Sequence, residues 1–442
     1  MKIPRSTTLR LIAALPLAVT TTLCTAQTLP ARTVPLANSQ AVPSSTRSAE
    51  MTSTLQNIEG DIAIGSAMTD LGSAEKARKH IISARTRLLP LISDLKQDDL
   101  EVWRLAGKLG RLEPDRMMAA QALEAIQRLA PNHSDIKSLA EVMAELTAAG
   151  LDSEVELVRT VRTTHAKALE GDAQSQLKLG AYYTDGRGVA RDDQAAFRWL
   201  SKAADQGNAT AQAKVGICYA TGAGVTANGQ EAIRWLTRSA QQGDPLGQSN
   251  LGACYLAGKG TEVNASEAIR WFTKAAEQGH ADAQFNLGIC HMNGQGVPKD
   301  MAKAVEWFAK AAENGHAAAQ YNMGFLCSKG EGVAKDNTKA FRWYSKAAQQ
   351  GYAEAQFSLA VQYMTGEGTA RNESESLRWF TAAAEQGHAK SQYNLGAYLS
   401  SDKNPSKDDA KARSWFKLLL SNPAAPADLK RMAQDRLDKL KK

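Results

Sequence analysis

The sequence lacks the features that mark most enzymes, membrane proteins and nucleotide-binding proteins. The apolar run Leu11–Val19 is too short to span a bilayer. The G-x-G pairs that recur along the chain follow no expected strand and precede no G-K-[ST], which argues against a phosphate-binding loop. Three matches to S-x-x-K, starting at Ser73, Ser134 and Ser175, have no S-D-N or K-T-G partner. Because no acid, base and nucleophile converge, we predict no catalytic site, cofactor or metal.

Cysteine is also scarce, with five in the chain. Cys24 lies in an expected export signal, Cys218, Cys254 and Cys290 share one position of a repeat, and Cys327 is one place out of phase. Packed helices lie about 8–10 Å apart, whereas a disulfide needs Cα atoms closer than about 7 Å. The spacing therefore predicts free, largely buried thiols.

Tryptophan marks the strongest pattern that is present. All but Trp103 follow one another at a constant step of 36 residues, and one glycine and one glutamine of each copy keep the same step. The tryptophans are Trp199, Trp235, Trp271, Trp307, Trp343, Trp379 and Trp415. A period this regular predicts a solenoid, and seven copies exceed the three or so that such stacks need for stability.

Each copy contains the signals of two helices. In the segment Ala281–Met292, the residues Gln284, Leu287, Gly288 and His291 recur at i, i+3, i+4 and i+7, which places them on one helical face. A G-x-G pair then supplies the positive φ angles of a helix C-cap and turn. We therefore expect this face to pack in the core and the glycines to act structurally.

The second helix is expected to begin at an Asp or Asn whose side chain accepts backbone N–H groups. These residues are Asp192, Asn228, Asn264, Asp300, Asp336 and Asn372. Glu231, Glu267 and Glu375 stand three places later, which predicts capping boxes. Histidines recur at the start of the first helix without converging on one point, so they predict no metal site.

The Trp ladder is expected to be structural. Trp271-Phe272 follows Ala268 and precedes Ala275-Ala276, so large and small residues alternate along the second helix. Such alternation favours interdigitated packing over a carbohydrate or cation–π site. We expect each Trp to fill the gap between its own repeat and the next, with truncation to Ala costing about 3–5 kcal/mol.

These residues resemble the Sel-one-like repeat (SLR) family, a branch of the tetratricopeptide-like helical-hairpin solenoids. The run A-A-E-Q-G-H-A-D-A-Q-F-N-L-G, the G-x-G-V turn and A-x-x-W-F-x-K-A-A occur in phase over about residues 171–421. The resemblance implies an all-α solenoid that binds protein partners on a curved surface. Departures are Pro245, Ala360 and the stretch from Asp402 to Pro405, which suggests a terminating repeat.

The chain divides into five predicted parts. Residues 1–26 are an export signal with cleavage before Gln27, and residues 27–54 are a disordered tether rich in Pro, Ser, Thr and Ala. Residues 55–165 form a divergent helical domain with helices Ser73–Leu89, Met117–Leu129 and Asp135–Ala148. Residues 166–421 are the seven-repeat α-solenoid. Residues 422–442 are a basic capping helix.

For function, the resemblance favours a non-enzymatic adaptor or scaffold of the bacterial envelope, periplasmic or secreted. An alternative is an envelope glycan or peptidoglycan binder that also uses the basic end, where residues 402–442 carry 11 Lys and Arg against 6 Asp and Glu. A β-lactam-binding enzyme is less favoured. The basic end has no interleaved aromatics, so we expect no nucleic acid, and we expect no membrane span in the mature chain.

The partner is expected on the first helix, opposite the core face, which similar solenoids turn to their concave side. At 100° per residue this face carries polar groups and, beside them, apolar groups that we expect to be exposed. The candidate partner-binding residues are Lys178, Lys214, Ile217, Asn250, Asn286, Ile289, Asn322, Phe325, Val361 and Asn394. An alternative left open is that neighbouring first helices bury these groups.

Overall fold

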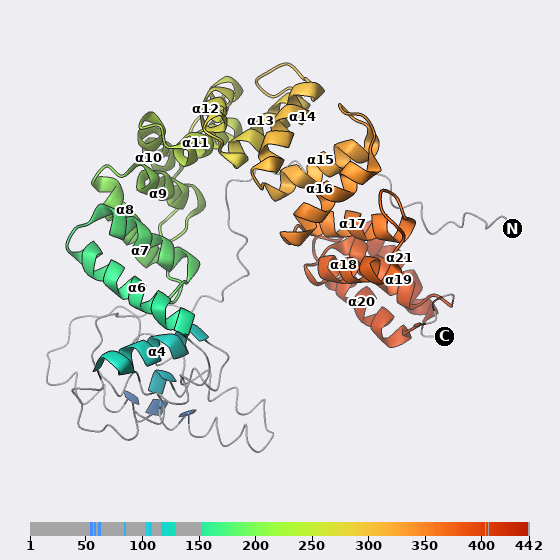
Figure 1. Cartoon of the computed structure of the whole chain (residues 1–442), viewed down its shortest axis with the longest axis horizontal. Helices are drawn as coiled ribbons and strands as arrows, with labels where there is room; N and C mark the ends of the chain where they lie inside the picture. Colours follow the sequence, from blue (N-terminus) through green and yellow to red (C-terminus); the bar gives the residue numbers. More distant parts are fainter. Residues whose placement is uncertain are drawn as a thin grey trace. The chain divides into compact units, whose positions relative to one another are not determined.

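The computed structural model describes residues 152–402, 404 and 406–440, together with 54–55, 57–58, 61–62, 84, 103, 105–107 and 116–129. Within these residues every regular element is a helix and no strand occurs (Figure 1). The predicted export signal, the helix Asp135–Ala148 and nearly all of the tether and of the helix Ser73–Leu89 lie outside the described residues. The helix predicted at Met117–Leu129 is confirmed as α4 (Arg116–Leu129).

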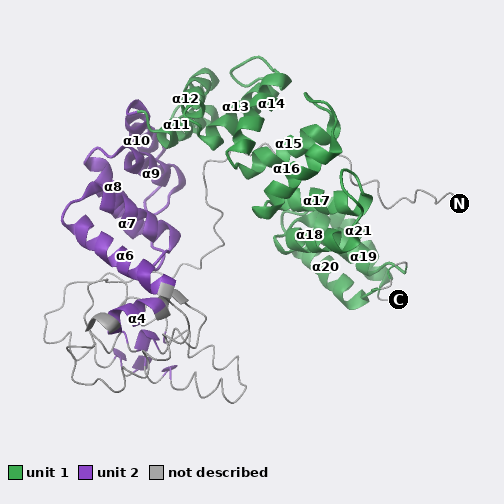
Figure 2. Cartoon of the chain, in the orientation of Figure 1, with its two compact units in different colours: residues 1–24, 243–442 green, residues 25–242 purple. Residues whose placement is uncertain are grey.

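The chain forms two compact units (Figure 2). We call the described residues up to 242 the N-terminal unit, and those from 243 onward the C-terminal unit. The first two of the seven predicted helix pairs lie in the N-terminal unit, and the other five lie in the C-terminal unit. The expected all-α solenoid of helix-turn-helix repeats is therefore confirmed.

Each repeat consists of a first and a second helix. The first helices are α7 (Ala173–Asp185), α9 (Ala209–Thr221), α11 (Pro245–Ala257), α13 (Ala281–Asn293), α15 (Ala317–Lys329), α17 (Ala353–Thr365) and α19 (Ala389–Leu399). The second helices are α8 (Asp193–Asp205), α10 (Gly229–Gln241), α12 (Ala265–Glu277), α14 (Met301–Glu313), α16 (Asn337–Gln349), α18 (Glu373–Glu385) and α20 (Asp409–Ser421).

All six predicted N-caps of the second helices are confirmed, and each side chain accepts a backbone N–H of the first turn. The capping boxes are different from the prediction. The Asn228 backbone N–H, which a reciprocal box would use, donates instead to the Tyr219 carbonyl at 2.8 Å. Glu231 is thereby free to pair with Arg234 at 3.0 Å. The Asn228 N–H, which Glu231 was expected to bond, therefore already has an acceptor in the first helix.

Glycine sets the distance between the two helices of a repeat. A Cβ built on Gly288 would lie 2.6 Å from the Phe308 ring, a separation that real side chains do not show. The sixth repeat has Ala360 at this position, and there the Ser376 hydroxyl donates to the Ala360 carbonyl at 2.7 Å. The turn glycine Gly368, at φ 81°, approaches the Asn337 carbonyl so closely that a Cβ would collide with backbone.

One glutamine per repeat ties three chain segments together, a role that the helical pattern did not reveal. Gln284 donates from Nε2 to the Ala276 carbonyl of the preceding second helix at 3.1 Å. Its Oε1 accepts from the Asn314 side chain, at the end of its own second helix, at 2.8 Å. Gln284 is buried, so its bond to Ala276 is shielded from water, whereas the bond from the exposed Asn314 is only partly buried. The same residue therefore fixes the spacing of successive repeats.

The helix α6 (Asp152–Leu169) extends the repeat pattern toward the N-terminus. Gln176 of α7 donates to the Ala168 carbonyl at 3.0 Å, as Gln212 does to the Ala204 carbonyl at 3.2 Å. The helix α6 thus occupies the place of a second helix before the first repeat, and it runs through the boundary predicted at 165/166. It also contacts α4, where Glu124 pairs with Arg162 at 2.7 Å.

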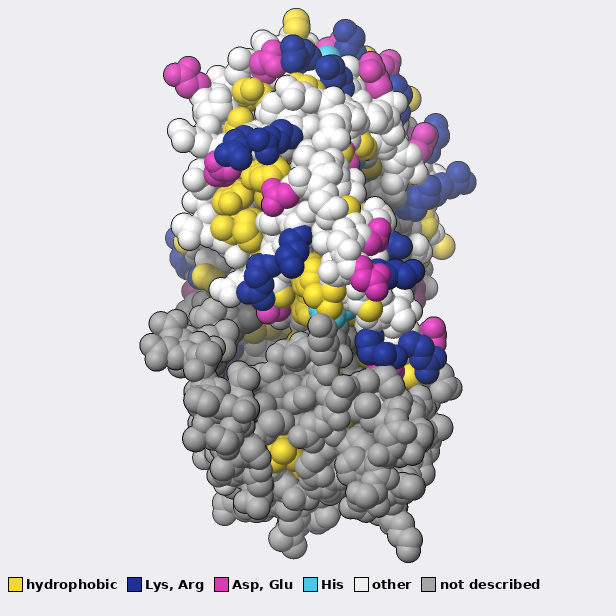
Figure 3. Space-filling model, turned by 90° about the vertical axis from the view of Figure 1, so that its left-hand side faces the viewer, with side chains coloured by type: hydrophobic (Ala, Val, Ile, Leu, Met, Phe, Trp, Pro, Cys, Tyr) yellow, Lys and Arg dark blue, Asp and Glu magenta, His cyan; other side chains and the backbone are white. Residues whose placement is uncertain are grey.

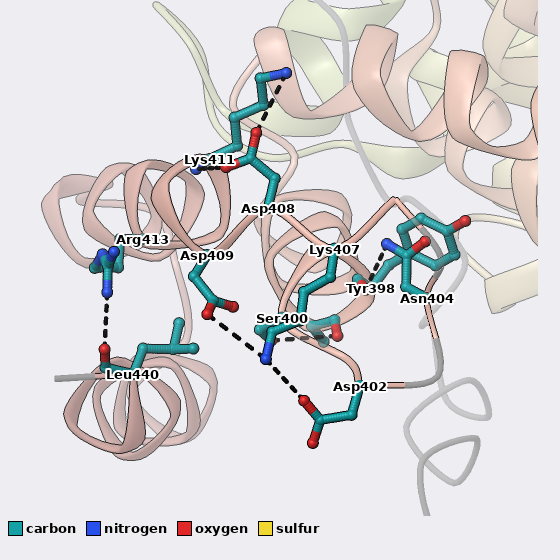
Figure 4. Close-up of polar contacts among 11 residues, drawn as sticks. Tyr398, Ser400, Asp402, Asn404, Lys407, Asp408, Asp409, Lys411, Arg413 and Leu440 are labelled. Atoms are coloured by element: carbon teal, nitrogen blue, oxygen red, sulfur yellow. Dashed lines mark hydrogen bonds and ion pairs between the residues drawn. The ribbon is translucent and has the colours of Figure 1, made fainter. Parts of the chain in front are cut away.

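The seventh repeat ends the array, and α21 (Ala427–Lys439) packs on its two helices. Lys407 pairs with Asp402 at 2.7 Å and with Asp409 at 3.6 Å, in the stretch that replaces the G-x-G turn (Figure 4). Arg413 donates to the Leu440 carbonyl at 2.7 Å and holds the end of α21. The predicted short helix over the last repeat is confirmed.

Candidate protein-interaction surface

The first helices of the C-terminal unit are buried on nearly every side. In α13 all residues from Ala283 to Cys290 are buried. Phe285 and Ile289 pack with Phe308 and with Met323 of the following repeat, whereas Leu287 and Cys290 pack with Phe272 of the preceding one. A first helix therefore contacts its own second helix and both neighbouring repeats, which leaves little of its surface for a partner.

The ten candidate residues consequently divide into three groups by burial. Lys178 is exposed, and four others are buried: Asn250, Asn286, Ile289 and Asn322. The remaining five are half-buried: Lys214, Ile217, Phe325, Val361 and Asn394. The expectation that Ile289 points to solvent is wrong, because the next repeat covers it. The alternative in which neighbouring repeats bury these groups holds at the four buried positions.

The buried asparagines differ in their hydrogen bonds. The Asn250 side chain donates to the Leu246 carbonyl one turn earlier at 2.9 Å. Asn322 has no exposed surface, and neither its Nδ2 nor its Oδ1 finds a partner in the described part of the chain. A polar group buried without a partner costs free energy. Asn322 therefore does not stabilise the fold in the way that Asn250 does.

The second helices carry Trp rings that cations of the same helix cover, although Trp271 itself is buried. Lys310 Nζ lies 4.3 Å from the Trp307 ring centroid, and Lys274 Nζ lies 4.6 Å from that of Trp271. Trp307 is half-buried and also packs against a cluster that contains Phe272 of the preceding repeat. The ladder is thus a packing device, as predicted, but Trp307 closes the gap to the repeat before its own.

Charges of both signs share the outer surface. On the side of the molecule drawn in Figure 3, Lys and Arg side chains lie among Asp and Glu, with hydrophobic side chains between them. Several pairs are one helical turn apart, such as Arg270–Glu267 at 3.4 Å and Arg378–Glu375 at 2.8 Å. Exposed pairs of this kind contribute little to stability and leave the surface close to neutral.

Three histidines cap first helices, at the positions where other repeats have Asp or Asn. His316 Nδ1 accepts the Ala319 backbone N–H at 3.1 Å, while its ring stacks on Phe285 with centroids 4.4 Å apart. Its Nε2 lies 3.4 Å from Asp282. Burial lowers the pKa of His316, and burial lowers that of His388 to about 4. These rings are neutral caps rather than exposed side chains.

The remaining chemically notable groups are structural too. Cys218, Cys254, Cys290 and Cys327 are free thiols, as the spacing predicts, and burial raises the pKa of Cys254 to about 11 and that of Cys290 to about 12. Ser175, one of the S-x-x-K serines, is buried at the start of α7, where its N–H donates to Asp172. Cys24, Ser73 and Ser134 lie outside the described residues.

A search of the described residues found no group of His, Cys, Asp and Glu that could hold a metal ion. It also found no helix of the length and apolarity needed to cross a membrane.

Comparison with known families identifies the repeats. The Sel1 repeat model matches seven times, at residues 173–208, 209–244, 245–280, 281–316, 317–352, 353–388 and 389–421, which is more than half of the chain. The chain belongs to the Sel1 repeat family. Sel1 repeat proteins generally act as scaffolds for protein–protein interaction, and the family is typically non-enzymatic.

Solved structures of Sel1 repeat proteins are similar. A protective antigen present in uropathogenic Escherichia coli strains, which displays an SLR fold, is 30% identical with a TM-score of 0.51, over 63% of this chain and 64% of that one. A Sel1 repeat protein from Oxalobacter formigenes is 30% identical with a TM-score of 0.49, over 58% of this chain and 99% of that one. This chain therefore covers less than two thirds of the antigen. No curated protein matches.

Proposed function

We propose that this Sel1 repeat protein is a non-enzymatic adaptor of the bacterial envelope that binds a protein or peptide on the face formed by its first helices. We take this face to be the concave one. The observation that carries the proposal is the contrast between the two helix faces. The outer face pairs its own charges and covers its own Trp rings. Along the first helices, Lys178 is exposed, and Ile217 and Phe325 are half-buried and keep part of their surface, although Lys329 Nζ lies 5.9 Å from the Phe325 ring centroid.

The position of the protein in the envelope is part of the same proposal. Residues 1–26 have the composition of an export signal, with Lys2 and Arg5 ahead of the short apolar run. N-terminal sequencing of the native protein should give a start at or near Gln27. An intact Met1 would contradict export. A chain that starts at an acylated Cys24 would contradict cleavage before Gln27 and would indicate an exported protein that is anchored to lipid.

Site-specific photo-crosslinking tests the binding face. A photoreactive residue at Phe325, on a first helix, should crosslink to a protein in an envelope extract. The same residue at Lys310, on the exposed face of a second helix, is the matched control and should give no specific product. Crosslinks at Lys310 and none at Phe325 would place the binding face on the second helices. Absence of protein crosslinks at every position would contradict the adaptor function.

A further inference from the structure

Lys178 and Lys214 occupy the same position of two successive repeats. This position carries lysine in both repeats of the N-terminal unit and no lysine in the C-terminal unit. Lys178 on α7 is exposed and Lys214 on α9 is half-buried, both in the N-terminal unit. In the C-terminal unit the same repeat position carries the buried Asn250, Asn286 and Asn322 and the half-buried Ser358 and Asn394. The long cationic side chains therefore stand in the two repeats of the N-terminal unit, and shorter uncharged residues stand in the C-terminal unit.

Neither of these two lysines forms an ion pair or a cation–π contact within the described part of the chain. Some other cations of the N-terminal unit have partners there: Arg191 pairs with Asp193 at 3.1 Å, and Lys202 Nζ lies 4.3 Å from the Trp199 ring centroid, whereas Arg198 on the second helix α8 is unpaired as well. Lys178 and Lys214 form neither kind of contact.

Acidic groups near the lysines are few or already engaged. Asp172 accepts the Ser175 N–H at 2.7 Å as the N-cap of α7. Asp185, at the end of α7, lies seven residues beyond Lys178, which is about 10 Å along a helix. An unpaired ammonium group on an accessible face gains from an incoming carboxylate without losing an existing ion pair.

Apolar surface accompanies each lysine. Ala181 follows Lys178 by three residues and Ile217 follows Lys214 by three, and side chains at i and i+3 are neighbours on a helix. Both are half-buried, so each retains some surface. This combination of cation and apolar group fits a polypeptide with acidic and apolar side chains better than a glycan, whose hydroxyl groups would find no apolar match.

We propose that Lys178 and Lys214 dock an extended acidic segment of the protein partner, an inference that rests on the proposed adaptor function. Packed helices lie about 8–10 Å apart, and an extended chain rises about 3.3 Å per residue. Carboxylates three or four residues apart in the segment therefore match lysines on first helices of successive repeats. The half-buried Ile217 receives an apolar side chain from the same segment.

The test uses the full mature chain and a fluorescent peptide that has Glu at every third place, with Ser and Leu between the Glu residues. Binding is measured as the fluorescence anisotropy of the peptide. The wild type should bind this peptide but not the Lys-for-Glu version. The double variant Lys178→Glu/Lys214→Glu should weaken binding at least tenfold. Arg198→Glu, an exposed and unpaired position on α8, is the matched control and should change binding less than twofold. Circular dichroism should be the same for all three proteins.

Several outcomes would overturn the inference. The first is that the acidic peptide does not bind, and the second is that the double variant binds it as the wild type does. The third is an equal loss of binding in Arg198→Glu, which would indicate a non-specific effect of net charge. Binding of an acidic polysaccharide in place of the peptide would also contradict it. If the double variant still crosslinks its protein partner through Phe325 as the wild type does, the adaptor function stands and the acidic-segment inference fails.

Discussion

The first helices α11, α13 and α15 are buried on most sides, whereas the second helices keep one face in solvent. In α13 the buried run extends from Ala283 to Cys290, while in α14 Lys303, Glu306 and Lys310 are exposed. The first helices accordingly carry small and amide residues that allow close approach. The second helices carry large aromatic residues inward and charges outward. We therefore expect substitutions of buried packing residues to lower the free energy of unfolding much more than substitutions on the solvent face of the second helices.

The largest effect is expected where a second helix fills the space left by a first-helix glycine. Phe308 is fully buried against Gly288, so Phe308→Ala should destabilise the protein by about 3–5 kcal/mol. Trp307, its half-buried neighbour, is the matched control, and Trp307→Ala should cost clearly less. Urea denaturation followed by circular dichroism compares the two. Equal losses would mean that the exposed face of the second helix is packed as tightly as its core face.

The second effect concerns the bond between repeats. Gln284→Met keeps the size of the side chain but removes its two hydrogen bonds, leaving the Ala276 carbonyl and the Asn314 amide without it. We expect a loss of about 1–3 kcal/mol. Gln295→Met, in the exposed turn after α13, should change the denaturation midpoint little. If both variants were equally stable, the glutamine ladder would be incidental to the stacking of repeats.

The sequence predicted the repeat, its two helices and its caps, because these depend on local chemistry that every copy repeats. Asp300 caps α14 whatever surrounds it, since its side chain bonds a backbone N–H three residues away. The same local view missed the glutamine ladder. Gln284 fell on the core face of the helical wheel, but its partners Ala276 and Asn314 come from two other helices.

The candidate surface was harder to predict for a similar reason. A helical wheel of one repeat assigns one buried face and one opposite face, which placed Ile289 outward. In the array, the following repeat covers that side and buries Ile289 beside Met323. Only the residues at less crowded positions, such as Lys178 and Phe325, remain accessible. Contacts between repeats therefore decide which part of the face a partner can reach.

A smaller effect should appear as the pH falls. The first-helix caps His280, His316 and His388 accept N–H groups through Nδ1, so each must be neutral there. Burial lowers all three pKa values, that of His388 to about 4, below the usual value of 6.5. Their stabilisation is present above the usual value of about 6.5 and is lost as the pH falls below it through each lowered pKa, about 4 for His388, because the unfolded chain binds the protons first.

Replacing these histidines with Asn, the cap that Asn208 already provides in the second repeat, isolates this effect. We expect the wild type to lose about 1 kcal/mol per cap between pH 7 and pH 4 relative to the triple variant. Thermal melts across this range would measure the difference. Parallel pH profiles for the two proteins would show that the histidines are not the caps on which stability depends.

The smallest effect separates two asparagines at the same position of first helices that lie two repeats apart in the sequence. Asn250 bonds the Leu246 carbonyl, so Asn250→Leu should lower stability by about 1 kcal/mol. Asn322 is fully buried with neither polar atom paired, so Asn322→Leu, which is similar in size and apolar, should be neutral or stabilising. The two variants differ only in the repeat that carries them. A clear loss of stability in Asn322→Leu would instead reveal a polar contact that Asn322 makes within the fold.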